Sequence, residues 1–488
     1  MTNNNLHVVI VPWLAFGHLI PFLQLSMALA KAGIRVSFIS TPRNVQRLPK
    51  VPPNLAALVR FVELRLPTVE GLPLGAEATV DVSMDEIQHL KTAYDLLRHQ
   101  VKQFVANESP DWIIQDFIPF WVAEIAREYG VPLITFSVYS AATLGFHGPL
   151  DYLTNDGHAK YWTSPESMMF PPEWVTFPSS VAFRRHEANA AFAGFFGQNA
   201  SSITDNERVV VAVEACQAVA IRSCTEYEPD YLNLVEKIWR RPVIPVGLLP
   251  PAPSSTEAKE REGEWGKIFK WLDGEKPRTV VFVAFGSECK LSRDQVYEIA
   301  HGLELSNLPF LWALRKPTWA VDEDDALPSE FRRRTEGRGV VCMGWAPQLE
   351  ILGHPSIGGS LFHSGWGSII ETLQHGHALV VLPFVADQGL NARQLVEKGL
   401  AVEVERSEED GRFEGSDVAE ALKKVMVDEG GESLRARAAS MRAVFGDVKL
   451  HQDHYIGGLV QYLQQKQQKQ QQNKSTLNDY RSSSPKNR

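Results

Sequence analysis

The sequence has little cysteine, no long apolar run and no excess of basic residues. Its 488 residues include four cysteines, scattered singly without a Cys-x-x-Cys pair, which excludes a disulfide framework and favours reduced thiols. No stretch reaches the roughly 18 consecutive apolar residues that a membrane-spanning helix needs. The first residues lack the basic and apolar regions of a signal peptide. We therefore expect a cytoplasmic protein without membrane insertion.

The charge balance and the absence of cofactor motifs exclude further classes. Lys and Arg number 49 against 58 Asp and Glu, a net charge of −9, which argues against a nucleic-acid-binding protein. No Gly-x-Gly-x-x-Gly turn follows the first apolar run, which disfavours a dinucleotide oxidoreductase. The acidic run at residues 322–325 is typical of a solvated loop, and His375 and His377 have no partner ligands at metal spacing. We expect no metal and no resident cofactor.

Apolar runs alternate with helical repeats, which predicts two α/β domains with parallel sheets. A segment rich in proline and serine, from Leu249 to Thr256, separates two such series and is typical of a linker. Strands are predicted at residues 7–12, 35–40, 62–64, 112–115, 133–138, 219–223 and 243–246, then at 279–285, 310–314, 339–343, 359–362, 379–382 and 401–404. Helices are predicted at residues 18–32, 84–105, 120–129, from 141, and at 293–304, 347–352, 368–374, 391–398, 416–427 and 432–445, with an irregular, aromatic-rich segment at 156–206.

A phosphate-binding site is predicted in the turn from His363 to Ser368. This turn lies between an apolar strand and a helical run. Backbone N–H groups of such a turn and the positive end of the helix dipole bind anions. Its glycines, Gly365 and Gly367, allow close approach and unusual φ angles.

The longer stretch from Trp345 to Gln388 resembles the donor-binding signature box of plant family 1 UDP-dependent glycosyltransferases. Segments 11–18 and 38–43 are similar to the branch with sugar-on-sugar and terpenoid-glycoside transferases, and the resemblance covers the chain except its Gln-rich tail. It implies two facing Rossmann-like, doubly wound α/β domains (GT-B type) with an interdomain cleft. The implied parts are an acceptor-binding domain at 1–248, a linker at 249–264, a UDP-sugar-binding domain at 265–445, a helix at 446–463 that packs back on the first domain, and a disordered tail at 464–488.

The resemblance assigns roles that agree with the chemistry of the residues. Trp345 offers a flat face to a uracil ring, Glu371 offers a carboxylate to two ribose hydroxyls, and His363 suits a diphosphate. The implied UDP-binding residues are Ser287, Trp345, Ala346, Gln348, His363, Gly365, Gly367, Ser368 and Glu371, and the implied donor-sugar residues are Ser140, Trp366, Asp387 and Gln388. The sequence departs from the family at Ser364, where Cys is usual, and at Gly367, where Asn is usual and supplies one contact.

His18 and Asp116 are the candidate catalytic residues. A base must take the proton of the acceptor hydroxyl, and histidine titrates in the right range. At a helix N-terminus the dipole is expected to keep the His18 ring neutral. Asp116 ends a neighbouring strand and can orient the ring and stabilise the imidazolium. Each residue alone also fits helix capping, and His18 a buried position, but the pairing and the resemblance favour a catalytic dyad.

The acceptor site is expected at the loops after the first-domain strands, with Phe16, Trp121 and Tyr139 as candidates and the aromatic segment 161–196 as wall or core. The expected reaction is an inverting, metal-independent transfer of a hexose from a UDP-sugar to a hydroxyl of a plant flavonoid, terpenoid or their glycosides. Gln388 favours glucose in this family. Two alternatives stay open. One is a UDP-rhamnose-dependent rhamnosyltransferase acting on a glycoside, and the other is a non-catalytic UDP-sugar-binding protein. We expect a monomer with two small-molecule partners, the donor and the hydroxylated acceptor.

Overall fold

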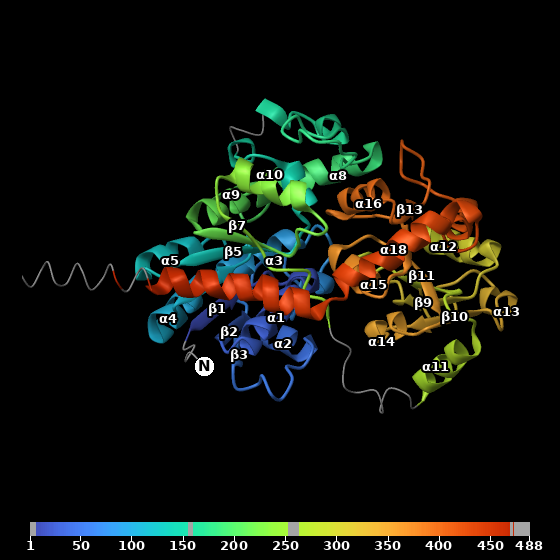
Figure 1. Cartoon of the computed structure of the whole chain (residues 1–488), viewed down its shortest axis with the longest axis horizontal. Coiled ribbons are helices and arrows are strands. Elements are labelled where there is room, and N and C mark those ends of the chain that lie inside the picture. Colours follow the sequence, from blue (N-terminus) through green and yellow to red (C-terminus); the bar gives the residue numbers. More distant parts are fainter. Residues whose placement is uncertain (1–5, 155–159, 252–262, 469–471, 473–488) are drawn as a thin grey trace, which may run out of the picture.

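The structure is a computed structural model that describes residues 6–154, 160–251, 263–468 and 472. The described chain forms two parallel β-sheets, each covered by helices. The two sheets lie next to one another (Figure 1). No helix in these ranges is long and apolar enough to cross a membrane. Residues 252–262 of the expected linker, and 469–471 and 473–488 of the expected tail, lie outside the described residues.

The first sheet has seven strands in the order β3-β2-β1-β4-β5-β6-β7. Its central strands β1 and β4 are buried along their whole length, as expected for parallel strands covered on both faces. The strands are β1 (His7–Val11), β2 (Arg35–Ser40), β3 (Val59–Glu63), β4 (Trp112–Gln115), β5 (Leu133–Ser137), β6 (Ala218–Ile221) and β7 (Val243–Pro245). The helices of this half are α1 (Phe16–Lys31), α2 (Pro42–Arg47), α3 (Ile87–Asp95), α4 (Arg98–Glu108), α5 (Val122–Tyr129), α6 (Ala141–His147), α8 (Arg185–Phe196), α9 (Asp205–Ala215) and α10 (Pro229–Trp239), with short 3-10 turns η1 (Thr79–Asp81), η2 (Leu150–Tyr152) and η3 (Pro165–Met169).

The second sheet has six strands in the order β10-β9-β8-β11-β12-β13. The strands are β8 (Val280–Ala284), β9 (Phe310–Leu314), β10 (Gly339–Met343), β11 (Ile357–Phe362), β12 (Ala378–Val381) and β13 (Ala401–Glu403). The helices are α11 (Glu264–Gly274), α12 (Arg293–Ser306), α13 (Phe331–Arg334), α14 (Gln348–Leu352), α15 (Trp366–Leu373), α16 (Gln388–Glu397), α17 (Gly415–Met426) and α18 (Glu432–Phe445), with the turn η4 (Glu429–Gly431).

Each sheet has one point where the strand order reverses, between β1 and β4 in the first and between β8 and β11 in the second. Ligands of open α/β sheets bind outside the carboxyl ends of the strands at such points. His18 and Asp116 follow β1 and β4, whereas Ser287 and His363 follow β8 and β11. The topology therefore brings the expected catalytic pair together on one sheet and the expected phosphate residues together on the other.

The C-terminal helix returns to the first half of the chain. After α18 a π-helical segment, η5 (Leu450–Ile456), continues as a helix over residues 457–468. Figure 1 shows this helix, in red, running across α1. Its residues Ile456, Leu459 and Leu463 are fully buried in the core cluster that also contains Val8 of β1.

Helix α16 follows a strand of the second sheet and packs against both halves, with α8 of the first half beside it (Figure 1). Leu390 is fully buried in the core cluster of the first half. The Arg393 guanidinium forms ion pairs with Glu187 of α8 and with Glu403 of β13. The side chain of Arg393 is 9% exposed, so α16 is held by buried charges from both halves.

Several segments differ from the sequence-based expectation. The helix predicted at residues 84–105 is two helices, α3 and α4, because Leu97 N–H bonds to the carbonyl of Tyr94, three residues back, and this tighter turn breaks the helix. The segment predicted to be irregular contains α8, whose aromatic residues and single glycine, Gly194, obscured the helical spacing. Further helices that were not predicted are α2, α9, α10, α11 and α13. Pro229 at the first position of α10 is nevertheless a typical helix start.

Candidate active site

His18 and Asp116 lie within hydrogen-bonding distance at the carboxyl edge of the first sheet. His18 is in the first turn of α1, and its Nδ1 is 2.7 Å from Oδ2 of Asp116. The same oxygen accepts the backbone N–H of Trp13 at 3.1 Å, which fixes the carboxylate. Because a carboxylate only accepts, Nδ1 carries the proton and Nε2 presents a lone pair. That Nε2 atom is 3.5 Å from the hydroxyl of Tyr139.

Three carboxylates act on the pKa of His18. Burial alone would lower this pKa, but the charge and hydrogen bond of Asp116, together with the charges of Asp387 and Glu288, raise it above its ordinary value. The direction of this shift is opposite to the one that a helix dipole alone would produce, because the carboxylates favour the imidazolium. Once deprotonated, His18 is therefore a stronger base than an ordinary histidine.

The turn between β11 and α15 has an open helix N-terminus. A Cβ on Gly367 would meet nothing closer than 3.7 Å, so a ligand can approach the backbone there. The left-handed φ expected at the glycines lies instead at Ser364, with φ 58°, whereas Gly365 has φ −65°. The hydroxyl of Ser364 is 2.8 Å from the carbonyl of Gln388 and fully buried, so it faces the protein rather than a ligand.

His363 is held between two glycines next to this helix. A Cβ on Gly286 or Gly365 would lie 2.8 or 2.6 Å from the imidazole, so a larger residue at either position would displace the ring. Burial lowers the pKa of His363 to about 4, and its Nδ1 has no hydrogen-bond partner in the described part of the chain. Ser287, which follows Gly286, and Ser368, in the first turn of α15, are partly exposed. A neutral imidazole, two hydroxyls and a helix N-terminus together suit a phosphate group.

A carboxylate, an amide and an exposed indole follow one another around α14 and α15. The Gln348 Nε2 group donates to Oε2 of Glu371 at 2.6 Å. Burial raises the pKa of Glu371, while the Gln348 hydrogen bond and the charge of Arg222 oppose that change. Trp345 is 69% exposed just before α14, and the Ala346 carbonyl accepts the backbone N–H of Gln348 at 2.8 Å. An exposed flat ring just before α14 and a carboxylate bonded to Gln348 of α14 suit a nucleoside, with its base stacked and its ribose diol bonded.

Asn391, which the sequence reasoning missed, connects two of the expected donor-sugar residues. Its Nδ2 donates to Oδ2 of Asp387 at 2.8 Å, and its Oδ1 accepts the hydroxyl of Ser140 at 2.9 Å. Asn391 stands four residues after Asp387, a spacing that places both on one face of a helix and that the sequence already contains. Because Ser140 is fully buried with its hydroxyl bonded, it links the first half to α16.

The other two expected donor-sugar residues have side chains engaged by the protein. Oε1 of Gln388 accepts the backbone N–H groups of Phe384 and Val385 at 2.9 and 3.0 Å, and its Nε2 donates to Sγ of Cys289 at 3.7 Å. The indole of Trp366 donates to the carbonyl of Arg222 at 2.8 Å and is 4% exposed. The expectation that the Trp366 side chain lines the sugar site is therefore corrected, because this ring fills the core.

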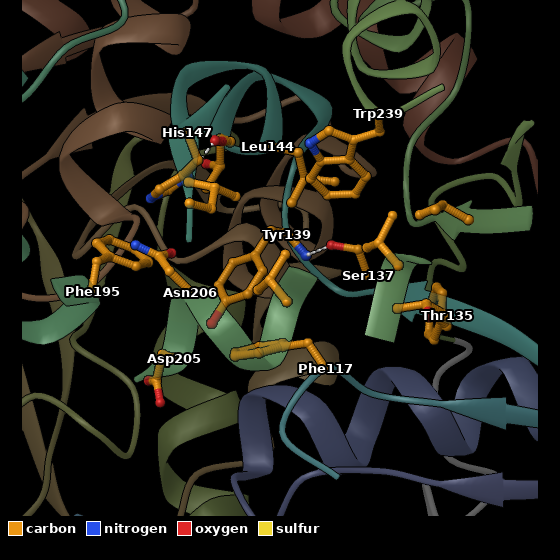
Figure 2. Close-up of a pocket in the computed structure, with 16 residues that line it drawn as sticks. Phe117, Thr135, Ser137, Tyr139, Leu144, His147, Phe195, Asp205, Asn206 and Trp239 are labelled. Atoms are coloured by element: carbon orange, nitrogen blue, oxygen red, sulfur yellow. Dashed lines mark hydrogen bonds between the residues drawn. The ribbon is translucent and has the colours of Figure 1, made fainter. Parts of the chain in front are cut away.

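A largely apolar pocket lies beside His18 in the first half (Figure 2). Phe117 and Tyr139 line it, and their ring centroids are 6.1 and 5.6 Å from that of His18. The rest of the wall comes mainly from β5, α6, α8 and α9. The centre of a water molecule can move through about 60 Å³ of the pocket, and one water needs roughly 10–15 Å³ by this measure. Several waters, or one end of a larger molecule, therefore fit.

Of the three acceptor candidates, only Tyr139 lines this pocket. Trp121 is 2% exposed, and its indole N–H donates to Asp95 at 3.0 Å, so it is a core residue. Phe16 packs on the core cluster around α1. The sequence predicted that these residues lie in loops. It did not predict where their side chains point, because the direction of a side chain in a loop depends on packing. In the aromatic segment, Phe195 lines the pocket.

The acidic run is an exposed turn, whereas His375 lies in the turn after α15 and His377 is buried just before β12. In the acidic run, Oδ1 of Asp322 accepts the backbone N–H of Asp325 at 2.8 Å in an exposed turn. Among the described residues no three His, Cys, Asp or Glu side chains are grouped as metal ligands.

Comparisons with known proteins give the family and the fold of this chain. The family model described as "UDP-glucoronosyl and UDP-glucosyl transferase" matches residues 254–436. UDP-glycosyltransferase 91A1 of Arabidopsis thaliana is 44% identical over 94% of this chain and 96% of its own length. Soyasaponin III rhamnosyltransferase of Glycine max is 40% identical over 94% of this chain and 95% of its own. The crystal structure of Glycyrrhiza uralensis UGT73P12 with glycyrrhetinic acid 3-O-monoglucuronide shares the fold with a TM-score of 0.79 at 22% identity, covering 98% of this chain and 99% of that one. Arabidopsis thaliana UGT89C1 complexed with UDP-L-rhamnose gives a TM-score of 0.71 at 22% identity, covering 95% and 100%.

Proposed function

The chain belongs to the plant family 1 UDP-dependent glycosyltransferases, in the sugar-on-sugar branch, and from this premise we propose the reaction that it catalyses. The enzyme moves a hexose, with glucose favoured, from a UDP-sugar to a hydroxyl of a plant secondary metabolite or its glycoside. The transfer inverts the anomeric carbon and uses no metal ion, and the enzyme acts as a cytoplasmic monomer. The observation that carries the proposal is the 2.7 Å contact between His18 and Asp116, within electrostatic reach of Asp387 from the second half.

In the proposed step the acceptor oxygen forms a bond to C1 of the donor sugar while the bond from C1 to the β-phosphate oxygen breaks. The proton of the acceptor hydroxyl passes to Nε2 of His18, and UDP leaves with the electron pair. Asp116 stabilises the imidazolium that results. The sugar passes through an oxocarbenium-like state, as in glycoside hydrolysis.

The second half is proposed to bind UDP and to stabilise the charge that grows on it. The N-terminus of α15, His363 and two serine hydroxyls surround the diphosphate, and such fixed donors need no reorganisation during the reaction. Asp387 and the amide nitrogen of Gln388, whose contact with Sγ of Cys289 is a long one of 3.7 Å, bind hydroxyls of the transferred sugar. The UDP-binding set is Ser287, Trp345, Ala346, Gln348, His363, Gly365, Gly367, Ser368 and Glu371.

A rhamnosyltransferase that uses UDP-rhamnose on a glycoside is the second candidate, supported by the similarity to a soybean rhamnosyltransferase. Mass spectrometry of products from UDP-glucose, UDP-rhamnose and UDP-xylose with flavonoid and triterpenoid aglycones and their monoglycosides separates the two. Product from glycosides alone supports transfer onto a sugar. Absence of product from every donor would contradict the proposed activity.

Replacing Glu371 with alanine is expected to weaken UDP binding about 10-fold to 100-fold, since hydrogen bonds to a charged group contribute about 1.5–3 kcal/mol. The carboxylate accepts both ribose hydroxyls in the proposed complex, and calorimetric titration with UDP measures the change. Glu420→Ala, at an exposed position of α17, is the control and is expected to bind UDP as the wild type does. An unchanged affinity in Glu371→Ala would contradict the ribose contact.

The rate is expected to rise with pH through a midpoint above 6.5, because the pKa of His18 is raised and the base must be deprotonated. Initial rates of UDP release at low substrate concentration, from acid to mildly alkaline pH, measure this midpoint. Asp116→Asn is expected to move the midpoint to lower pH as well as slow the reaction, because it removes the charge that opposes burial. Because the pKa of His18 is higher in the folded chain than in the unfolded chain, protonation of His18 also stabilises the fold. This contribution to the free energy of unfolding is complete below pH 6.5 and is lost as the pH rises through the folded-state pKa. A profile independent of pH across this window would speak against His18 as the base.

A further inference from the structure

Two polar atoms in the pocket wall have no hydrogen-bond partner among the described residues. They are Nε2 of His147, the last residue of α6, and Nδ2 of Asn206, the second residue of α9. Both side chains line the pocket, and their residues are 7% and 2% exposed. Figure 2 shows the imidazole and the amide directed toward the same end of the pocket, next to Phe195. Buried polar atoms are nearly always paired, so two at one place require an explanation.

The protonation state of His147 follows from its other ring nitrogen. Nδ1 is 2.7 Å from the carbonyl oxygen of Thr143, and a carbonyl only accepts, so Nδ1 carries the proton. Burial lowers the pKa of His147 to about 4, which keeps the ring neutral near pH 7. Nε2 is therefore a bare acceptor, whereas Nδ2 of Asn206 is a donor.

Other polar groups of the pocket are already paired. The Asp205 carboxylate binds the Lys91 ammonium at 2.5 and 2.7 Å. The Thr135 hydroxyl donates to a backbone carbonyl at 2.9 Å, and the Ser137 hydroxyl accepts the backbone N–H of Tyr139 at 3.3 Å. The unmet acceptor and the unmet donor therefore stand out in a wall that is otherwise apolar or satisfied.

We propose that His147 and Asn206 form a polar subsite that binds a second hydroxyl of the acceptor, separate from the hydroxyl that reacts at His18; this inference rests on the proposed function. A hydroxyl donates to Nε2 and accepts from Nδ2 at the same time, whereas an ether or a carbonyl can only accept. Phe117 and Tyr139 join the pocket to His18. The acceptor class that fits has an apolar body with one hydroxyl at the reacting end and another at the far end, as in a diphenol.

Binding of two matched probes tests the subsite. The probes are 4,4′-dihydroxystilbene and 4-hydroxystilbene, which differ by one distal hydroxyl, and equilibrium dialysis with UDP present measures their affinities for the full chain. The wild type is expected to bind the dihydroxy probe about tenfold more tightly, the effect of a satisfied buried hydrogen bond. His147→Phe, which keeps a ring against Phe195 at a present centroid distance of 4.1 Å, and Asn206→Leu are each expected to remove this preference. His99→Phe, at an exposed position of α4, is the matched control and retains it.

Each outcome of these binding measurements either supports or overturns the subsite. Equal binding of the two probes by the wild type, binding of neither, or a preference that persists in both pocket variants overturns the subsite. Normal UDP binding establishes that a variant is folded, and if His147→Phe does not fold, Asn206→Leu decides alone. Sugar transfer is assayed separately, so a preference without transfer would overturn the proposed function alone, and transfer without a preference would overturn the subsite alone.

Discussion

His18→Ala is expected to turn over roughly 100-fold to 10,000-fold more slowly than the wild type, the range for loss of a general base. The acceptor hydroxyl then has no group to take its proton as the bond to C1 forms. UDP binding is expected to be unchanged, because the proposed UDP site is built from the second half of the chain. Steady-state rates of UDP release give turnover, and calorimetry gives the UDP affinity.

His99→Ala is the matched control, since His99 is an exposed histidine of the same half. It is expected to keep both turnover and UDP affinity. Unchanged turnover in His18→Ala would overturn the dyad. UDP-sugar binding without turnover in the wild type would favour instead the non-catalytic binding protein, against which the 2.7 Å contact of His18 with Asp116 argues.

Arg393→Ala is expected to lower the free energy of unfolding by about 3–5 kcal/mol, the cost of removing one partner from a buried charge network. Glu187 and Glu403 have side chains that are 9% and 5% exposed, and both contact Arg393. Without the guanidinium, two buried carboxylates lose their shared cation. Urea denaturation followed by tryptophan fluorescence measures the change.

An exposed ion pair supplies the comparison. Arg98 and Glu124 have side chains that are 52% and 54% exposed, and Arg98→Ala is expected to cost about 0–1 kcal/mol. Equal losses in the two variants would contradict the view that burial of the α16 network, rather than pairing of charges in general, stabilises the fold.

Strands were predictable because parallel strands covered on both faces are continuous apolar runs. Residues 112–115 and 310–314 were predicted as strands and are β4 (Trp112–Gln115) and β9 (Phe310–Leu314). The helices of the first half were harder to predict, because composition does not reveal where a helix tightens, as it does at Leu97, or that an aromatic-rich segment forms α8. The two-domain fold therefore followed from periodicity and resemblance, while local bends depended on packing.

In the site, residues at strand ends were predictable in position, since parallel strands bring their carboxyl ends to one edge. This rule places His18 beside Asp116. It says nothing about where a side chain in a loop or helix points, so Trp121 and Trp366 were assigned to ligand sites although both rings fill cores. The rise in the pKa of His18 could not be predicted from the sequence either, because carboxylates from the second half contribute to it.

The attachment of α16 to the first half has a consequence for recombination between related genes. A chimera that joins residues 1–248 of this chain to the second half of a relative keeps Glu187 and Ser140, but it receives a foreign α16. Unless that helix brings an arginine and an asparagine at the positions of Arg393 and Asn391, buried groups on both sides lose their partners. A crossover that keeps these contacts exchanges the segments that hold Ser140 and Glu187 together with α16.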